Sequence, residues 1–284
     1  MKRQYCVCAQ LTEEEFETAI ARWSVLGMQG VEEIPCKGSA VFAKVYFTDR
    51  AAAETAAGIL RDTVGAVETV LVEPVIIKDW NARWRESMQP AVLAPSWWVS
   101  PEWLPPPLKQ EDHWIRIEPK MAFGTGHHAT TRLAAGELIT NKRVVRGGRI
   151  LDVGTGSGVL CFVAVGLGSV FCCGLEIDPD CRENLSENRD ANGLPERTLS
   201  FVIGSLGVVK NGMSFDVIAM NMIYTESAPL LHGCRSLLGT GGRLIWTGII
   251  NDEKKEAVAA GNEAGFRLVR ESSEEEWWCG LFRK

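Results

Sequence analysis

The sequence predicts an α/β protein in which a large, mostly parallel sheet follows a small α+β unit, and three observations support this fold class. From residue 149 onward, unbroken apolar runs alternate with helical patterns, as in a parallel sheet with helices on both faces. The last two runs, 265–271 and 275–284, are separated by a short Ser-Ser turn with no room for a crossover helix, so we expect them to pair antiparallel. Residues 5–76 follow the order strand, helix, strand, strand, helix, strand.

Composition excludes several classes of protein. The chain of 284 residues carries a formal net charge of −6, so it lacks the basic character that binding to nucleic-acid phosphates favours. We expect neither a signal peptide nor a membrane span, because no apolar run reaches the roughly 18 residues that a span needs. The nine cysteines show no CxxC or Cys/His metal spacing and are expected to be reduced thiols. These observations predict a cytoplasmic monomer without a metal site. Because of the negative net charge, a basic protein is a more favourable binding partner than a nucleic acid.

The first domain is expected to span residues 1–77. Thr12 and Glu15 form a Thr-x-x-Glu capping box that opens a helix through Leu26, and Asp49 caps a second helix. The expected strands are 5–11, 30–36, 40–47 and 67–76. This order matches the ferredoxin-like split βαβ plan, in which one face of the sheet is left open for a partner. We therefore interpret the first domain as a substrate-recognition domain.

Residues 78–120 are rich in tryptophan and proline, in the stretches DWNARWRESMQP, APSWWVSPEWLPPP and HWIRIEP. We interpret this segment as a linker with its own aromatic packing rather than a flexible tether. Stacking of nucleic-acid bases is the alternative role for the rings, but the tryptophans lack the interleaved basic residues that such a surface needs.

The second domain, 121–284, contains a glycine-rich loop directly after an apolar strand. The strand RILDV leads into Gly154-Thr155-Gly156-Ser157-Gly158, and a helical pattern follows. Glycines at such a turn let the backbone approach a ligand, toward which the amides at the start of the helix point. A dinucleotide-binding loop has the spacing GxGxxG, which Val159 breaks. The tighter GxGxG spacing suits an adenosine that carries an amino-acid tail.

Two polar residues follow later strands of the same sheet. Glu176 ends the next strand, where a carboxylate can accept hydrogen bonds from both hydroxyls of a ribose. Asp178 and Pro179 are expected to cap and open the following helix. Asn221 ends the fourth strand, at the sheet edge where ligands bind, and its uncharged amide can orient an amine without trapping it as a cation. Asn221 is therefore the candidate catalytic residue.

The segment MAFGTGHHATTRL, residues 121–133, is a glycine-punctuated loop that runs into a helix. Thr130 and Thr131 stand at the start of that helix, where they can cap it or contact a carboxylate. His127 and His128 suggest a base or a metal ligand, but the chain has four histidines in all, and we interpret this pair as bracing the loop.

Together the segments EPKMAFGTGHHATTRL, ILDVGTGSGVL, GLEIDPD, IAMNMIY and RLIWTGI resemble the ribosomal protein L11 methyltransferase family, PrmA. The resemblance covers nearly the whole chain and implies a Rossmann-like seven-stranded methyltransferase sheet whose C-terminal strand is antiparallel. It also implies S-adenosylmethionine as the cofactor and lysine side chains and an N-terminal amine of a ribosomal large-subunit protein as substrates. The candidate cofactor-binding residues are Phe123, Thr125, Thr131, Asp152, Gly154, Thr155, Gly156, Glu176, Ile177 and Asn221.

The chain departs from related patterns at two places, and alternatives stay open. The family usually has Asp where this chain has Glu176, although either carboxylate can hold a ribose diol. Asn221 and Tyr224 have the spacing of the NPPY motif of adenine and glutamine N-methyltransferases, but Met222 and Ile223 replace its two prolines. The alternatives are N-methylation of another protein, of a glutamine amide or of a nucleic-acid base, a module that holds the cofactor without turnover, and a nicotinamide dehydrogenase, whose GxGxxG loop the chain lacks.

Overall fold

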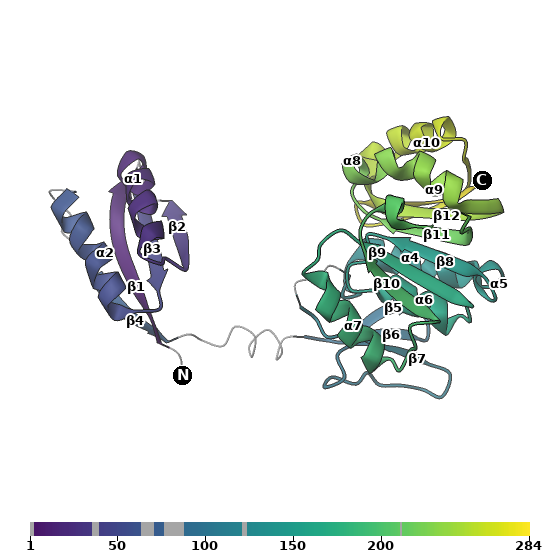
Figure 1. The fold of residues 1–284 in the computed structure, drawn as a ribbon, viewed down its shortest axis with the longest axis horizontal. Helices are drawn as coiled ribbons and strands as arrows, with labels where there is room; N and C mark the ends of the chain where they lie inside the picture. The colour runs from purple at the N-terminus through teal and green to yellow at the C-terminus, as the bar shows by residue number, and fades with distance from the viewer. Residues whose placement is uncertain (1–2, 36–39, 64–70, 77–87, 121–123, 211) are drawn as a thin grey trace. The chain divides into compact units, whose positions relative to one another are not determined.

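The computed structural model describes residues 3–35, 40–63, 71–76, 88–120, 124–210 and 212–284 and divides the chain into two compact units (Figure 1). The first unit is Met1–Met88 and the second is Gln89–Lys284. None of the described helices is long and apolar enough to cross a membrane.

The first unit has the expected split βαβ order. Its elements are β1 (Arg3–Thr12), α1 (Glu13–Val25), β2 (Gly30–Pro35), β3 (Ala40–Phe47), α2 (Arg50–Thr63) and β4 (Leu71–Ile76). The strands form an antiparallel sheet in the order β2-β3-β1-β4. The side chains of Trp23 and Phe47 are fully buried in its core. The sequence prediction of a small sheet domain before the main sheet is confirmed.

Both helix starts in this unit are capped as expected. The backbone N–H of Thr12 donates to Glu15 Oε2 at 2.8 Å, and the N–H of Glu15 donates to Thr12 Oγ1 at 3.3 Å. Asp49 Oδ1 accepts from the N–H of Ala51 at 3.1 Å. The capping residues therefore satisfy N–H groups that the first turn of each helix leaves without a partner.

The second unit starts with a small sheet made by the segment expected as a linker. Strands β5 (Ala91–Ala94), β6 (Trp97–Ser100) and β7 (His113–Arg116) lie in that order. Trp97 is buried and stacks on the ring of His113, with 4.1 Å between the ring centroids. Residues 89–120 thus pack as part of the second unit, while 77–87 lie outside the described residues.

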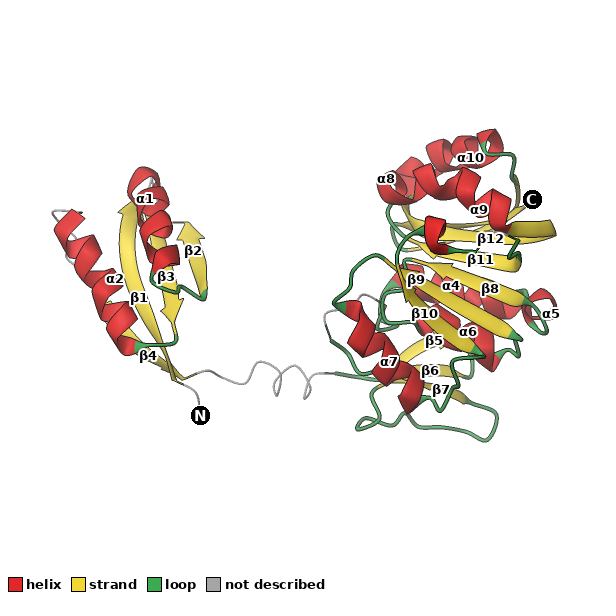
Figure 2. Ribbon diagram, in the orientation of Figure 1, coloured by secondary structure: helices red, strands yellow, loops and turns green. Residues whose placement is uncertain are grey.

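The main sheet has seven strands (Figure 2). They are β8 (Arg149–Val153), β9 (Phe171–Glu176), β10 (Leu199–Ile203), β11 (Phe215–Asn221), β12 (Leu238–Ile250), β13 (Arg267–Glu274) and β14 (Trp277–Arg283). Their order is β10-β9-β8-β11-β12-β14-β13, and only β14 runs antiparallel to its neighbours. The fold class that the sequence predicts, with an antiparallel C-terminal strand, is confirmed.

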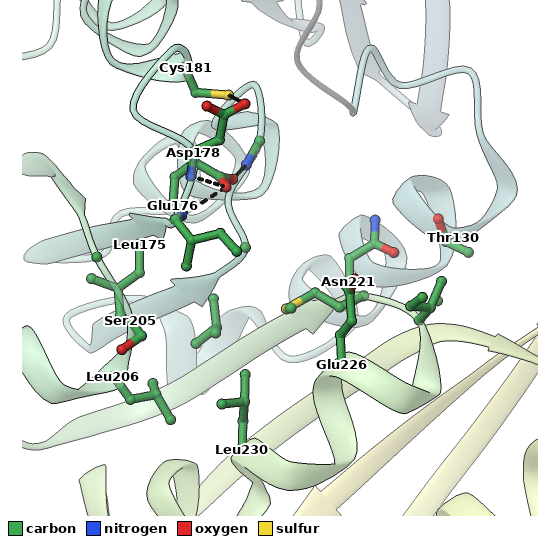
Figure 3. A pocket seen from close by; sticks show the side chains of 18 of the residues that line it. Thr130, Leu175, Glu176, Asp178, Cys181, Ser205, Leu206, Asn221, Glu226 and Leu230 are labelled. Atoms are coloured by element: carbon green, nitrogen blue, oxygen red, sulfur yellow. Dashed lines mark hydrogen bonds between the residues drawn. The ribbon is translucent and has the colours of Figure 1, made fainter.

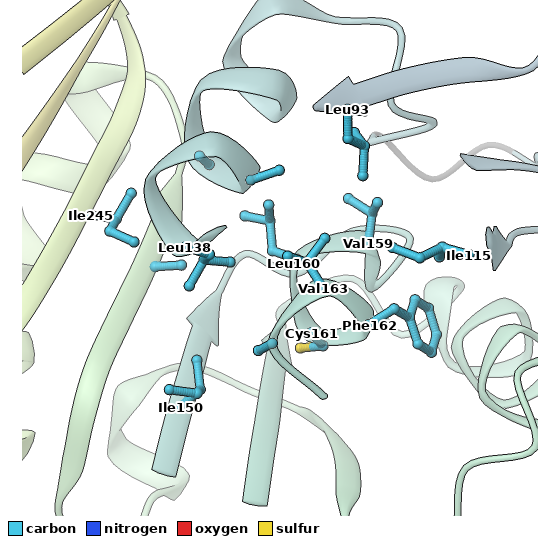
Figure 4. Close-up of a cluster of buried hydrophobic side chains, with 14 of the residues drawn as sticks. Leu93, Ile115, Leu138, Ile150, Val159, Leu160, Cys161, Phe162, Val163 and Ile245 are labelled. Carbon is cyan, nitrogen blue, oxygen red and sulfur yellow. The ribbon is translucent and has the colours of Figure 1, made fainter. Parts of the chain in front are cut away.

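Helices cover both faces of this sheet. They are α4 (Ala129–Thr140), α5 (Lys142–Val145), α6 (Val159–Gly166), α7 (Cys181–Ala191), α8 (Tyr224–Ser227), α9 (Leu231–Leu237) and α10 (Lys254–Glu263). On one face, Leu138 of α4 and Val163 of α6 pack with Ile150 of the sheet and Leu93 of β5 (Figure 4). On the other face, residues of α9 and α10 pack with the alternate strand residues. The unbroken apolar character of the strands follows from this two-sided burial.

Two local predictions differ from the structure. The helix after β9 begins at Cys181 rather than at Pro179, although Asp178 Oδ1 accepts from the N–H of Asp180 at 2.9 Å, as a capping side chain does. The last hairpin does not turn at Ser272-Ser273. Both serines pair with β14, and the turn lies at Glu275, whose φ is 55°. Serine does not force a turn when its backbone groups find strand partners.

Candidate active site

The glycine loop brings backbone to the edge of the sheet between β8 and α6. The N–H of Thr155 donates to the carbonyl of Leu175 on β9 at 2.8 Å, which ties the loop to the neighbouring strand. Gly154 has a φ of +70°, and a Cβ atom there would lie 2.8 Å from Met222 Sδ. A side chain at Gly154 would therefore be strained in its backbone and would press on the strand that carries Asn221.

Glu176 at the end of β9 binds the loop by its carboxylate. Its Oε2 accepts from the N–H of Gly156 at 2.9 Å, and its Oε1 accepts from the N–H groups of Ile177 and Asp178 at 2.9 and 3.2 Å (Figure 3). Because Oε1 already accepts two hydrogen bonds and Oε2 one, the remaining accepting capacity lies at Oε2.

Asp152 and Thr155 lie beneath the loop. Both are buried, and the hydroxyl of Thr155 donates to Asp152 Oδ2 at 2.6 Å. The other carboxyl oxygen, Oδ1, has no hydrogen-bond partner among the residues that the structure describes. Burial raises the pKa of Asp152 to about 6, although hydrogen bonds from Thr155 and Cys161 act in the opposite direction. These side chains support the glycine loop from within the fold rather than facing the cavity.

Asn221 at the end of β11 is oriented by a threonine of α4. Its Nδ2 donates to the hydroxyl of Thr131, which is fully buried, over a long 3.5 Å. With the amide nitrogen directed at Thr131, Oδ1 is the atom left to accept a hydrogen bond from a bound molecule. Thr131 therefore acts on the site through Asn221.

These elements enclose a cavity of about 710 Å³ at the carboxyl edge of the sheet (Figure 3). Of the residues proposed from sequence, five line it together: Gly154, Gly156, Glu176, Ile177 and Asn221. Four described residues of that set do not: Thr125, Thr131, Asp152 and Thr155. Phe123 lies outside the described residues. A cavity of this size accommodates a ligand of nucleoside dimensions with a side chain.

The other lining residues were not among the cofactor-binding residues predicted from the sequence. They are His128, Thr130, Val153, Leu175, Asp178, Cys181, Gly204, Ser205, Leu206, Met222, Ile223, Glu226, Leu230, Gly248 and Trp277. His128 and Thr130 belong to the segment 121–133 that the sequence singled out. No pattern in the sequence indicated that Trp277 would line a cavity. His128 caps α4 by accepting from the N–H of Thr130 at 3.3 Å, and its ring lies 5.0 Å from the ring of Trp277.

The backbones of two lining residues, Gly248 and Met222, lie in close contact. Gly248, in β12, has a φ of +87°, and a Cβ there would lie 2.5 Å from the backbone oxygen of Met222. The site thus depends on close contact between β12 and the end of β11, which a one-dimensional pattern does not reveal.

The charges that face the cavity are negative. Glu176, Asp178 and Glu226 line it, and among its described lining residues there is neither lysine nor arginine. In the part of the chain that the structure describes, no group of histidine, cysteine and acidic residues could hold a metal ion. An acidic wall of this kind favours cationic ligands.

Comparison with known proteins places these features in context. A sequence model described as ribosomal protein L11 methyltransferase (PrmA) matches residues 6–284. The protein of that name from Thermus thermophilus is 39% identical over 208 residues, which are 72% of this chain and 77% of that protein. The Geobacter sulfurreducens protein of the same name is 34% identical over 206 residues, 72% of this chain and 66% of that protein, just under two thirds of its length.

A solved structure agrees with the sequence relatives. The crystal structure of a ribosomal protein L11 methylase from Lactobacillus delbrueckii subsp. bulgaricus is similar to this chain with a TM-score of 0.62 and 27% identity. The similarity covers 69% of this chain and 100% of that one.

Proposed function

This chain belongs to the ribosomal protein L11 methyltransferase family, a family of S-adenosylmethionine-dependent protein methyltransferases, and from that premise we propose which reaction its cavity performs. The chain transfers methyl groups from S-adenosylmethionine to amine nitrogens of ribosomal protein L11, namely lysine side chains and the N-terminal amine. The observation that carries the proposal is a single cavity lined by the glycine loop, by Glu176 and by Asn221.

The cavity suits S-adenosylmethionine in shape and in charge. Gly154 and Gly156 line the cavity without side chains, so the amino-acid tail can approach their backbone closely, and Glu176 Oε2 keeps accepting capacity for a ribose hydroxyl. The acidic lining attracts both a sulfonium and the ammonium form of a substrate lysine.

Asn221 is the residue that we assign to the reacting amine. When bound, the cofactor supplies a methyl group already activated by its positive sulfur, so the protein's part is to align the acceptor and exclude water. Asn221 Oδ1, set by the contact between Nδ2 and Thr131, can accept a hydrogen bond from the amine and aim its lone pair. A lysine amine has an ordinary pKa of about 10.4. The acidic lining favours its charged form on entry, whereas placement beside the positive sulfur of a bound cofactor would favour loss of the proton and the neutral, nucleophilic amine.

The position of Tyr224 does not favour the alternative methyl acceptors, a nucleic-acid base or a glutamine amide. Its ring stacks on Trp246, with 6.0 Å between centroids, and it is absent from the residues that line the cavity. A tyrosine outside the cavity lining does not supply a ring on which a flipped base would stack there. The first unit is proposed to recognise the protein substrate, because each cofactor-type motif lies in the second unit.

The direct test is a methylation assay with isotopically labelled S-adenosylmethionine and purified ribosomal protein L11, followed by peptide mass spectrometry. We expect label on lysine side chains and on the N-terminal amine. Incubation with a whole-cell lysate and with ribosomal RNA serves as the comparison. Label on RNA or on a different protein, with none on L11, would contradict the proposed substrate.

A further inference from the structure

Two asparagines of helix α7, Asn184 and Asn188, and Asn192 at its C-cap follow one another at intervals of four residues, and their side chains bind the backbone of an extended segment. Asn192 Oδ1 accepts from the N–H of Arg116 at 3.0 Å, and its Nδ2 donates to the carbonyl of Arg116 at 2.6 Å. Asn188 Oδ1 accepts from the N–H of Glu118 at 2.8 Å, and Asn184 Nδ2 donates to the carbonyl of Glu118 at 3.0 Å.

The spacing of these residues has a geometric reason. Four residues of α-helix advance by about 6.0 Å, and two residues of extended chain advance by about 6.6–6.8 Å. Side chains four residues apart on a helix therefore keep pace with alternate residues of an extended segment. Asn192 meets Arg116, Asn188 meets the N–H of Glu118, and Asn184 meets the carbonyl of Glu118. Asn184, Asn188 and Asn192 thus hold residues 116–118 as a neighbouring strand would.

Asn188 differs from its neighbours because it also reaches the glycine loop. Its Nδ2 donates to the carbonyl of Ser157 at 3.0 Å, and the hydroxyl of Ser157 donates to the carbonyl of Gly124 at 2.8 Å. Asn188 is fully buried, so water does not replace these bonds. Asn192 makes its side-chain hydrogen bonds to Arg116 and to the carbonyl of Asn188, and among the described residues none of its hydrogen bonds reaches the loop.

We propose that Asn188 is a positioning residue for cofactor binding. Its amide joins α7, residues 116–118 and the glycine loop, and so sets the position of Ser157. The Ser157 hydroxyl in turn sets the position of the segment that begins at Gly124. The inference rests on the proposed function for the identity of the ligand. Asn188 does not itself line the cavity, but through Ser157 it holds the loop ready for the ligand, so that less ordering is needed on binding.

The test compares Asn188→Ala with the matched variant Asn192→Ala. Each variant removes a side-chain amide that binds residues 116–118, but only Asn188→Ala removes a hydrogen bond to the glycine loop. S-adenosylhomocysteine is titrated into the full chain by calorimetry, and thermal unfolding is measured in parallel. We expect both variants to lose similar stability. We expect the Kd to rise about fivefold or more in Asn188→Ala, the effect of about one hydrogen bond, and to change less than twofold in Asn192→Ala.

A second readout does not depend on the ligand. Amide hydrogen exchange at residues 154–158 of the ligand-free chain is expected to be faster in Asn188→Ala than in Asn192→Ala. If Asn188→Ala does not fold, Asn188→Asp keeps the acceptor for Glu118 and removes the donor to Ser157. Equal Kd values and equal exchange for the two alanine variants would overturn the positioning role. Failure of the unaltered chain to bind S-adenosylhomocysteine would instead overturn the proposed function, and exchange would still decide the role of Asn188.

Discussion

Asp152 provides a prediction whose size follows from its surroundings. Asp152 is 1% exposed beneath the glycine loop, and its Oδ1 has no hydrogen-bond partner in the described part of the chain. Burial raises its pKa to about 6 from an ordinary value of 3.8. The folded chain therefore holds this proton more tightly than the unfolded chain does, and the neutral carboxyl favours folding at low pH.

The raised pKa of Asp152 makes the free energy of unfolding fall as the pH rises. Stability from this group is fully present below pH 3.8 and is lost as the pH rises through 6, because the folded state then carries a buried charge. At about 1.4 kcal/mol per pKa unit, the raised pKa corresponds to about 3 kcal/mol in total, of which about 2 kcal/mol is lost between pH 4.5 and 7.5.

The assay is urea unfolding of the whole chain and of Asp152→Asn at several pH values from 4.5 to 7.5, followed by tryptophan fluorescence. Trp246 and Trp278 are fully buried in the second unit and report on its unfolding. Asparagine keeps the shape and the acceptor for Thr155 but cannot ionise. The unaltered chain should lose about 2 kcal/mol relative to the variant across this range. A difference that stays constant with pH would refute the argument that Asp152 ionises with a raised pKa.

Four further changes test the site. Glu176→Ala should weaken S-adenosylmethionine binding by about 1–3 kcal/mol in calorimetry, and an unchanged Kd would mean that the ribose is held elsewhere. Gly154→Arg should abolish that binding, because a side chain there crowds Met222 and fills the approach to the loop. Asn221→Ala should lower kcat by about tenfold to a hundredfold with little change in cofactor Kd, whereas an equal loss in both would indicate a cofactor contact only. A chain beginning at Lys78 should bind cofactor normally and fail to methylate L11, and full-rate methylation would assign substrate selection to the second unit.

Much of the fold was predictable because it depends on local patterns. Unbroken apolar strands between helices indicate burial on both faces, and the short interval before β14 excludes a crossover helix. Thr12 with Glu15, and Asp49, mark the helix starts through bonds to their own neighbours. The hairpin turn at Glu275 was missed because the partner strand, rather than the local residue type, decides where pairing stops.

The sequence by itself determined the succession of strands and helices along the chain. It also determined the glycine loop and the polar residues that end β9 and β11, since each of these features is encoded by spacing along the chain. Only the tertiary structure decided that Thr130 lines the cavity while Thr131 contacts Asn221, and that Trp277 meets His128. It also decided that Asn188 joins α7 to Ser157. The physical reason is that periodicity encodes which face of an element is buried, whereas contacts between distant segments depend on how whole elements pack against each other.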